Sequence, residues 1–154
     1  MKNEYKNGRY SGERITKNFS MGELTHTNCG LPNEPDEKQK TMLRFLARNY
    51  LQPLRDRFGR IDINSAFRTP EVNKAVGGVK NSAHMQGLAA DINIPSLYVA
   101  CQFVAFFIER FTRDGWGFDQ LIISHRRKTG NYWLHLGVAE VSTGNRLQVK
   151  YLEY

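Results

Sequence analysis

The chain has 154 residues, which fits one domain and excludes a large multidomain protein. Hydrophobic residues make up 40% and charged residues 24%, a globular composition that excludes collagen, coiled coil and a wholly disordered chain. The formal net charge of +7 predicts long-range attraction to an anionic partner such as nucleic acid, acidic lipid or bacterial cell wall.

The first residues are polar and charged, and they lack the apolar segment of a signal peptide. We therefore expect a loosely held arm over 1–18, a single domain over 19–154, and synthesis in the cytoplasm without a signal peptide. The longest apolar stretch, 99–108, is too short for a membrane span and predicts a core helix. Cys29 and Cys101 are interpreted as free thiols.

Capping signals and apolar spacing predict two helices in the first third of the chain. Ser20 and Glu23 have the spacing of a capping box, so a short helix should begin there. From Asp36, apolar residues recur every three or four positions. This spacing predicts an amphipathic helix that ends near Gly59 and kinks at Pro53.

The middle of the chain predicts strands on either side of a short helix and a loop. Alternation of apolar and polar residues predicts a strand over 61–66. Thr69 can cap a helix and Pro70 suits its first position, so a short helix follows. A loop is expected over 78–87 and a strand over 89–94.

The last third predicts an apolar helix over 96–112, a hairpin of strands 118–123 and 132–138 with a basic loop at 124–131, and a final strand over 147–152. Strands and helices do not alternate regularly enough for a doubly wound sheet. We therefore predict an α+β domain whose small antiparallel sheet is flanked by helices. With helices on one face, the other face or one end of the sheet is available for a site.

Three side chains suited to metal binding, His84, Asp91 and His135, lie in or next to predicted strands. A carboxylate flanked by Ala and Ile needs a partner, which a divalent cation supplies. Two histidines and one carboxylate leave one position of a tetrahedral zinc ion open, as in catalytic zinc sites. Such a site activates water at neutral pH and polarises a carbonyl, which indicates peptide or amide hydrolysis.

The segment SAHMQGLAAD at 82–91 resembles the Ser-x-His-x-x-Gly-x-Ala-x-Asp signature of the M15 peptidases. These are zinc D-Ala-D-Ala carboxypeptidases and L-Ala-D-Glu endopeptidases that act on peptidoglycan. WLH at 133–135 resembles the Trp-x-His that carries their second histidine ligand. Segments similar to the family's other blocks occur in the same order at 19–24, 65–73 and 118–122. The resemblance runs from about residue 18 to 140, and it implies the fold of the hedgehog and D-Ala-D-Ala peptidase type.

The resemblance implies that His84, Asp91 and His135 bind Zn²⁺ and that Arg68 contacts a substrate carboxylate. A guanidinium would hold such a carboxylate through two hydrogen bonds. Alternatively, Arg68 forms a salt bridge that fixes the loop before Pro70. Ser82 either hydrogen-bonds the substrate or orients the turn that carries His84.

The sequence departs from the family at the general base. The family commonly has Glu or Asp three residues before the second histidine, where this chain has Tyr132, a hydrogen-bond donor at neutral pH. We select Asp119: if Ser124 pairs with Tyr132 in the hairpin, Asp119 lies on the face of His135. A one-residue slip would turn it away and leave a cap or turn residue. His125 is the alternative, as a proton donor or oxyanion contact.

These inferences predict a zinc-dependent peptidoglycan peptidase of the D-Ala-D-Ala carboxypeptidase kind. The alternatives are an L-Ala-D-Glu endopeptidase and a zinc-containing wall-binding module that has lost hydrolysis. A nucleic-acid binder, suggested by charge alone, would need steep salt-dependent DNA affinity, and we expect no specific nucleic acid. By family analogy we expect a phage-type lysis enzyme, or endolysin, that is monomeric, has no membrane span, and reaches the wall through a separately made membrane lesion.

Overall fold

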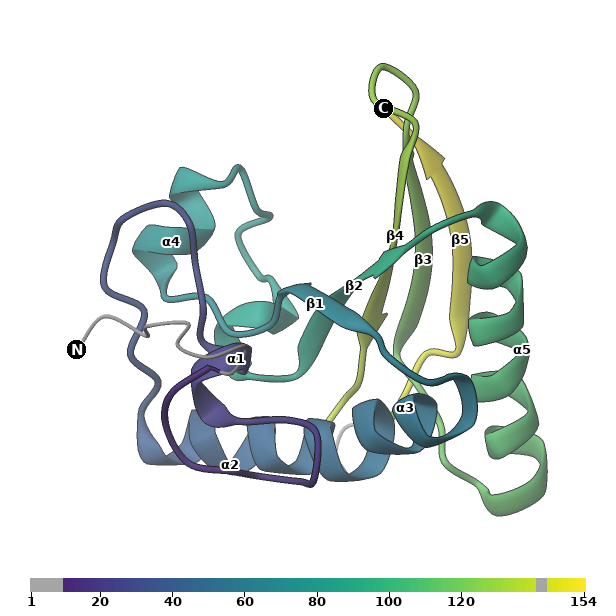
Figure 1. Ribbon diagram of the computed structural model, residues 1–154, viewed down its shortest axis with the longest axis horizontal. Helices are drawn as coiled ribbons and strands as arrows, with labels where there is room; N and C mark the ends of the chain where they lie inside the picture. The colour runs from purple at the N-terminus through teal and green to yellow at the C-terminus, as the bar shows by residue number, and fades with distance from the viewer. Residues whose placement is uncertain (1–9, 141–143) are drawn as a thin grey trace.

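A computed structural model describes residues 10–140 and 144–154 (Figure 1). The helical segments are α1 (Met21–Leu24), α2 (Glu37–Leu46), the π-helical turn η1 (Ala47–Leu51), α3 (Gln52–Phe58), α4 (Pro70–Ala75), the 3-10 turn η2 (Ala83–Gln86) and α5 (Leu97–Asp114). The strands are β1 (Asp62–Ser65), β2 (Ala89–Ile94), β3 (Gln120–Arg126), β4 (Asn131–Gly137) and β5 (Gln148–Glu153). The predicted α+β class is confirmed.

The strands form one five-stranded sheet in the order β1-β2-β4-β3-β5. Three neighbouring pairs are antiparallel, but β5 runs parallel to β3. The prediction of a purely antiparallel sheet is therefore wrong. The reason is topological: β4 ends at Gly137, opposite the first residue of β3, and the chain re-enters the sheet at that end, where Gln148 pairs with Gln120.

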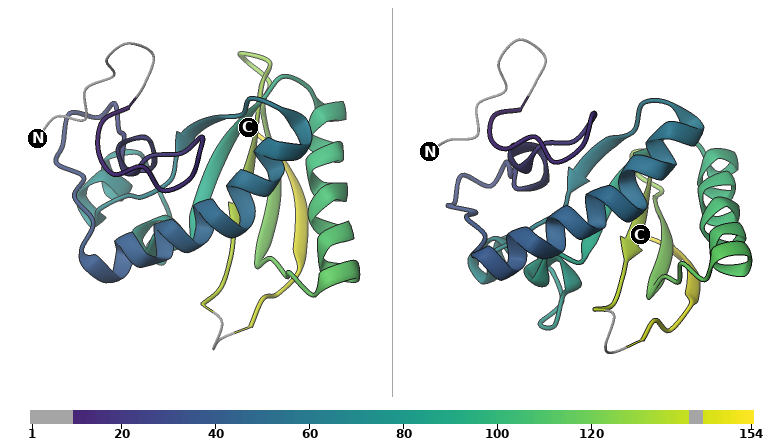
Figure 2. Two further views of the ribbon diagram at one scale, coloured as in Figure 1. Left: turned by 60° about the horizontal axis from the view of Figure 1, so that its bottom comes forward. Right: turned by 90° about the horizontal axis from the view of Figure 1, so that it is seen from below.

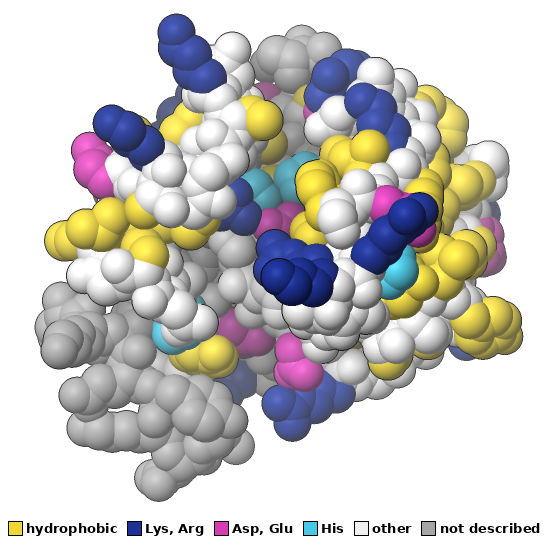
Figure 3. All heavy atoms as spheres, turned by 90° about the horizontal axis from the view of Figure 1, so that it is seen from above, with side chains coloured by type: hydrophobic (Ala, Val, Ile, Leu, Met, Phe, Trp, Pro, Cys, Tyr) yellow, Lys and Arg dark blue, Asp and Glu magenta, His cyan; other side chains and the backbone are white. Residues whose placement is uncertain are grey.

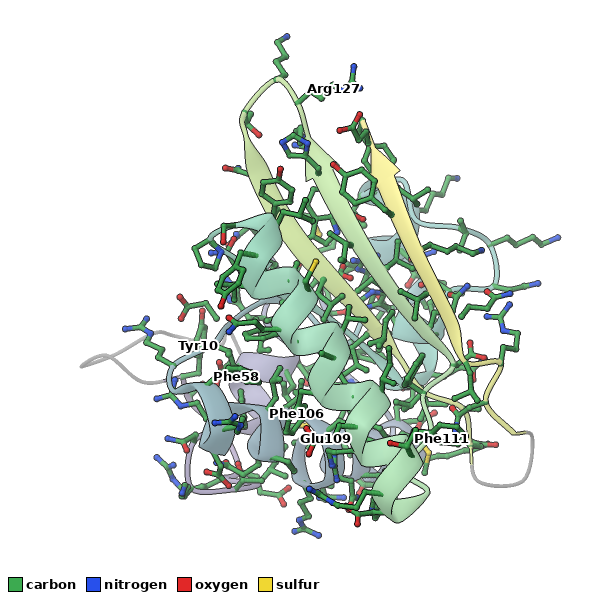
Figure 4. The ribbon with its side chains drawn as sticks, turned by 90° about the vertical axis from the view of Figure 1, so that its right-hand side faces the viewer. Tyr10, Phe58, Phe106, Glu109, Phe111 and Arg127 are labelled. Carbon is green, nitrogen blue, oxygen red and sulfur yellow. The ribbon has the colours of Figure 1, made fainter. Side chains whose placement is uncertain are left out.

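Helix α5 covers one face of the sheet and contacts β2, β3 and β4 (Figures 1 and 4). The strand residues that face it are apolar and buried, among them Ile92, Leu121 and Leu134. Burial of this apolar surface is the main force that holds the two layers together. None of the helices in the described ranges is long and apolar enough to cross a membrane. The predicted core helix is thus confirmed, and the opposite face of the sheet is left for the site.

A long helical segment formed by α2, η1 and α3 runs beneath the sheet (Figure 2). It begins at Asp36, whose side chain accepts a hydrogen bond from the backbone of Gln39 while the Gln39 side chain accepts one from the backbone of Asp36. It ends at Gly59, where φ is +82°. Both ends agree with the prediction, because caps and glycine act locally.

The π-helical turn η1 lies just before Pro53, where the sequence predicts a kink. Proline has no N–H to donate to the carbonyl of Asn49, four residues earlier. The guanidinium of Arg110 on α5 donates to that carbonyl instead, at 2.6 Å, and lies over the rings of Tyr50 and Trp116. The side chain of Arg110 therefore provides the hydrogen bond that the Asn49 carbonyl cannot receive from Pro53, and it joins this helical segment to α5.

The predicted caps and the final strand agree with the structure. Ser20, Thr69 and Ser96 cap α1, α4 and α5 through their side chains. Strand β3 ends at Arg126, later than predicted, and β4 begins at Asn131, one residue earlier than predicted, so the turn shortens to 127–130. The predicted loop 78–87 contains η2. Cys29 and Cys101 are exposed free thiols.

The predicted N-terminal arm falls partly outside the described residues, which begin at 10. Within its described part, Arg14 forms a β-bridge with Ser20, and Ile15 is 7% exposed and belongs to the hydrophobic core. The packed domain therefore includes residues before 19.

Glu23 on α1 gives the fold a pH dependence. Burial, with a smaller effect from Asp62, raises the pKa of Glu23 to about 7. Between its ordinary value of 4.5 and this value the folded state binds more protons than the unfolded state. Stability therefore falls as the pH rises across this interval, and the loss is complete above it.

We expect Glu23→Gln to raise the free energy of unfolding at pH 8 by about 1 kcal/mol, because glutamine carries no charge that burial disfavours. This figure is smaller than the full pKa shift implies, because solvent screens a partly exposed group. At pH 4 the gain should vanish, because Glu23 is then protonated in both states. Urea unfolding at the two pH values measures the difference. An equal gain at both values would contradict this explanation.

Candidate metal centre

His84 lies on η2, and hydrogen bonds fix both its backbone and its ring. The backbone N–H of His84 donates to the hydroxyl of Ser82, which caps the turn. The ring Nδ1 of His84 donates to the carbonyl oxygen of Ala66 at 2.6 Å, and the residue is 2% exposed. Because Nδ1 carries the proton in this contact, Nε2 of the neutral ring presents a lone pair.

Asp91 and His135 are brought together by the sheet. They are direct cross-strand partners on β2 and β4, and so their side chains lie on the same face. Nδ1 of His135 lies 3.0 Å from Oδ1 of Asp91. Nε2 of His84 lies 3.2 Å from Oδ2 of Asp91 and 3.3 Å from Nδ1 of His135. Figure 3 shows histidine and carboxylate side chains next to one another in a hollow of the surface.

The donor set fits a divalent cation. The lone pair of His84 Nε2 faces an oxygen of Asp91, which is also an acceptor, and a proton or a cation between them removes the repulsion. Two ligands bound at about 2.0–2.1 Å to a tetrahedral zinc ion lie about 3.3 Å apart. Nε2 of His84 and Nδ1 of His135 lie 3.3 Å apart, and each of them lies within 3.2 Å of one of the two oxygens of Asp91. One ligand atom from each of the three residues lies within 4.8 Å of the others. The three side chains that the sequence predicts as ligands therefore have a spacing suited to Zn²⁺.

Asp91 is ionised at this centre. Burial raises the pKa of Asp91, but positive charge between Asp91 and the rings of His84 and His135, carried by a proton or by a bound cation, outweighs burial and holds the pKa well below its usual range. Arg68 donates from Nη2 to Oδ2 of Asp91 at 2.6 Å and from Nε to the hydroxyl of Ser65 at 2.8 Å. Arg68 thus forms a salt bridge, one of the two predicted alternatives, and this salt bridge orients a candidate metal ligand.

The buried side chain of Asn33 holds the backbone around Arg68. Its Nδ2 donates to the carbonyl of Phe67 at 2.8 Å, and its Oδ1 accepts from the N–H of Thr69 at 2.8 Å. The backbone N–H of Arg68 itself donates to the carbonyl of His84. Sequence reasoning missed Asn33, because a lone asparagine in a loop carries no signal of contacts more than thirty residues away.

Gly87 ends the turn that carries His84. Its φ is +74°, and a Cβ there would lie 2.7 Å from the carbonyl oxygen of Gln39 on α2. Replacement by alanine would combine left-handed strain with a clash against backbone. We expect Gly87→Ala to lower the free energy of unfolding by about 2–4 kcal/mol.

Gly77 is the matched control, because its φ is +72° but nothing lies within 4 Å of its hypothetical Cβ. Gly77→Ala should lower the free energy of unfolding by only about 1 kcal/mol. Urea unfolding of both variants measures the difference. Equal losses would show that the close packing of η2 on α2 contributes nothing.

A cavity of about 420 Å³ opens beside His135. Its wall includes Asp119, Glu140 and Arg146. The register predicted for the hairpin is wrong by one residue: Ser124 pairs with Trp133, and Ile122 lies opposite His135. In a continuous strand this slip would turn Asp119 to the other face.

Asp119 nevertheless lines the same cavity as His135, because β3 begins only at Gln120 and Asp119 lies in a bend before it. Arg146 donates from Nε to Oδ1 of Asp119 at 2.8 Å and from Nη2 to Oδ2 at 2.6 Å. These bonds lower the pKa of Asp119 despite its partial burial, so the carboxylate is ionised. Sequence reasoning also missed Arg146.

The structure does not bring His125 to the metal centre. His125 pairs with Tyr132 across the hairpin, and the two rings stack at 4.1 Å on the face opposite His135. His125 also lies 3.5 Å from the carboxylate of Glu153. Tyr132 points away from the centre for the same reason, since side chains three apart on a strand lie on opposite faces.

The family model described as Peptidase M15 matches residues 17–127, a segment that includes Arg68, His84, Asp91 and Asp119 and stops before His135. No curated protein matches the chain. The second histidine lies outside this match, and its pairing with Asp91 across the sheet brings it to the centre.

Proposed function

The chain belongs to the peptidase M15 family, and from this premise we propose that it is a zinc-dependent peptidase that cleaves stem peptides of bacterial peptidoglycan. The convergence of His84, Asp91 and His135 at ligand spacing carries the proposal. We propose the D-alanyl-D-alanine bond as the site of cleavage, with the L-alanyl-D-glutamate bond as the alternative.

His84, Asp91 and His135 would hold the ion. Zn²⁺ bound by such ligands acts as a Lewis acid that polarises a carbonyl and lowers the pKa of water to about 7. The Ala66 carbonyl keeps Nε2 of His84 directed at the centre, and Arg68 keeps Asp91 oriented. Positioning contacts of this kind support metal affinity.

Arg68 and Ser82 are proposed substrate contacts. Nη1 of Arg68 forms no hydrogen bond with the described residues, so it is available to a substrate carboxylate beside the centre. Ser82 lines the cavity and uses its oxygen to accept from the His84 N–H, which leaves its own hydroxyl hydrogen for a substrate carbonyl.

Asp119 is the proposed general base. Its carboxylate is ionised and lies in the wall of the cavity that His135 shares. Oδ2 accepts one hydrogen bond, from Arg146, and keeps a lone pair that can accept a proton from the attacking water. Tyr132 points away from the centre, which supports a base from the cavity wall.

We propose that the protein acts on the cell wall as a phage-type lysis enzyme. The net charge of +7 supports attraction to anionic wall polymer, and this attraction should weaken as salt rises. Arg126, Arg127 and Lys128 project at the tip of the hairpin, where Figure 4 labels Arg127. They add positive charge at an exposed end of the sheet.

The test is digestion of purified peptidoglycan by the zinc-loaded protein, with mass spectrometry of the products. Release of D-alanine is the expected result. New amino termini on D-glutamate would instead support the endopeptidase. Wall binding with bound zinc but without released product would support the wall-binding module and overturn the peptidase.

A further inference from the structure

We propose that Arg146 binds a carboxylate of the substrate and so sets the specificity of the cavity. The inference rests on the proposed peptidase function and deepens it. A stem peptide that contains D-glutamate and ends in D-alanine carries at least two carboxylates. A second anion contact besides Arg68 therefore has a group to bind.

The guanidinium of Arg146 has two pairs of N–H groups, or forks, that can each bind a carboxylate, and only one of these pairs is occupied. Nε and Nη2 donate to the two oxygens of Asp119, and the backbone N–H of Arg146 also donates to Oδ1 of Asp119 at 3.2 Å. Nε and Nη2 therefore form the occupied pair, the side fork of the guanidinium. The end fork, formed by Nη1 and the second hydrogen of Nη2, has no partner in the described part of the chain, and it matches a carboxylate.

The location of Arg146 favours a ligand over a purely structural salt bridge. Among the described residues that line the cavity, it is the only lysine or arginine. Glu140, also in the wall, forms a salt bridge with Lys38 at 3.1 Å, and Asp119 is bound to Arg146 itself. A carboxylate that enters beside His135 therefore meets one accessible guanidinium.

Arg68 is less accessible than Arg146. Its side chain is 14% exposed and its Nε and Nη2 are occupied by Ser65 and Asp91, whereas the side chain of Arg146 is 57% exposed. Asp119 restricts the rotation of Arg146, so less conformational entropy is lost when the open fork binds. Arg146 thus combines exposure with a fixed orientation.

The test measures steady-state cleavage by Arg146→Gln with three peptides. The first is an L-Ala-D-Glu-containing stem peptide that ends in D-Ala-D-Ala. In the other two, either the glutamate or the terminal carboxylate is amidated.

We expect Arg146→Gln to raise KM for the first peptide by about 10- to 100-fold, which is the loss of affinity typical when a charge-assisted hydrogen bond is removed. One of the two amidated peptides lacks the carboxylate that Arg146 binds. With that peptide, the parent and Arg146→Gln should have the same KM, because the contact is already lost. An equal loss on all three peptides, or on none, would overturn the proposal.

Arg44→Gln is the matched control. Arg44 donates from Nε and Nη2 to the two carboxylate oxygens of Glu13, as Arg146 does to Asp119, but it lies on α2 and does not line the cavity. It should leave all three KM values unchanged. Arg146→Lys keeps the charge without the fork and should recover only part of the lost affinity; full recovery would overturn recognition by the fork.

Calorimetric binding of the same peptides, with chelator present to prevent turnover, separates this inference from the proposed function. Carboxylate-dependent binding that is lost in Arg146→Gln, together with no cleavage by the zinc-loaded parent, would keep the site and reject the peptidase. Binding by the parent without any preference for the carboxylate would overturn the role of Arg146 even if cleavage occurs. Thermal melting confirms that each variant is folded.

Discussion

His135→Ala should lose zinc and peptidase activity together. The substitution removes one of three ligand atoms that lie within 4.8 Å of one another. We expect the zinc affinity to fall by more than the 10- to 100-fold that is typical for loss of an outer-shell contact, and kcat to fall by about 10³-fold or more. Metal analysis after dialysis and peptidoglycan digestion measure the two quantities.

His125→Ala is the matched control for this prediction. His125 lies on the same hairpin, but on the opposite face of the sheet, where it stacks on Tyr132. Its loss should lower stability through the missing ring contact while zinc content and activity persist. If His135→Ala retained its zinc, the metal centre would be misassigned.

Asp119→Asn should lower kcat by about 10²- to 10⁴-fold, the usual contribution of a general base, without loss of zinc. Asparagine keeps an oxygen for the backbone N–H of Arg146 but cannot take a proton. An effect on kcat distinguishes the base from a positioning residue, because a residue that only orients Arg146 would change KM. Steady-state kinetics on the stem peptide, with zinc content measured in parallel, tests this.

Glu140→Gln is the control for Asp119, since Glu140 is the other carboxylate that lines the cavity. We expect its kcat to stay within about threefold of the parent, the range of a minor perturbation below 1 kcal/mol. The reverse pattern, with full rate in Asp119→Asn and a large loss in Glu140→Gln, would transfer the role of base to Glu140.

Local chemistry explains which elements were predictable. Ser20 and Thr69 cap their helices as predicted, and Asp36 and Ser96 cap the helices that were predicted to begin at those residues, because a cap involves atoms only two or three residues apart. The strands and the class of the fold follow from apolar periodicity in the same way. The ligands on β2 and β4 were found because the residue types and their spacing match a family motif.

The pairing of strands was harder to predict. The hairpin register differs by one residue from the prediction, and a slip of that size exchanges the faces of a strand. The true register places His125 and Tyr132 on the face covered by α5, together with Ile123 and Leu134. Packing of this apolar face against α5 favours this register, so the turn residues alone do not reveal it.

The sequence by itself determined the helices, the strands, the α+β class and the three candidate metal ligands. Only the tertiary structure decided that β5 runs parallel to β3, that Arg68 pairs with Asp91, and that Arg146 holds Asp119 in the cavity wall. The physical reason is the separation along the chain over which each kind of interaction acts. Capping and periodicity act within one or two turns of chain, whereas Arg68 and Asp91 are 23 residues apart and Arg146 and Asp119 are 27 apart. Contacts at that separation form only when the whole core packs, because the entropy of closing such loops is offset by burial of the apolar surface between them.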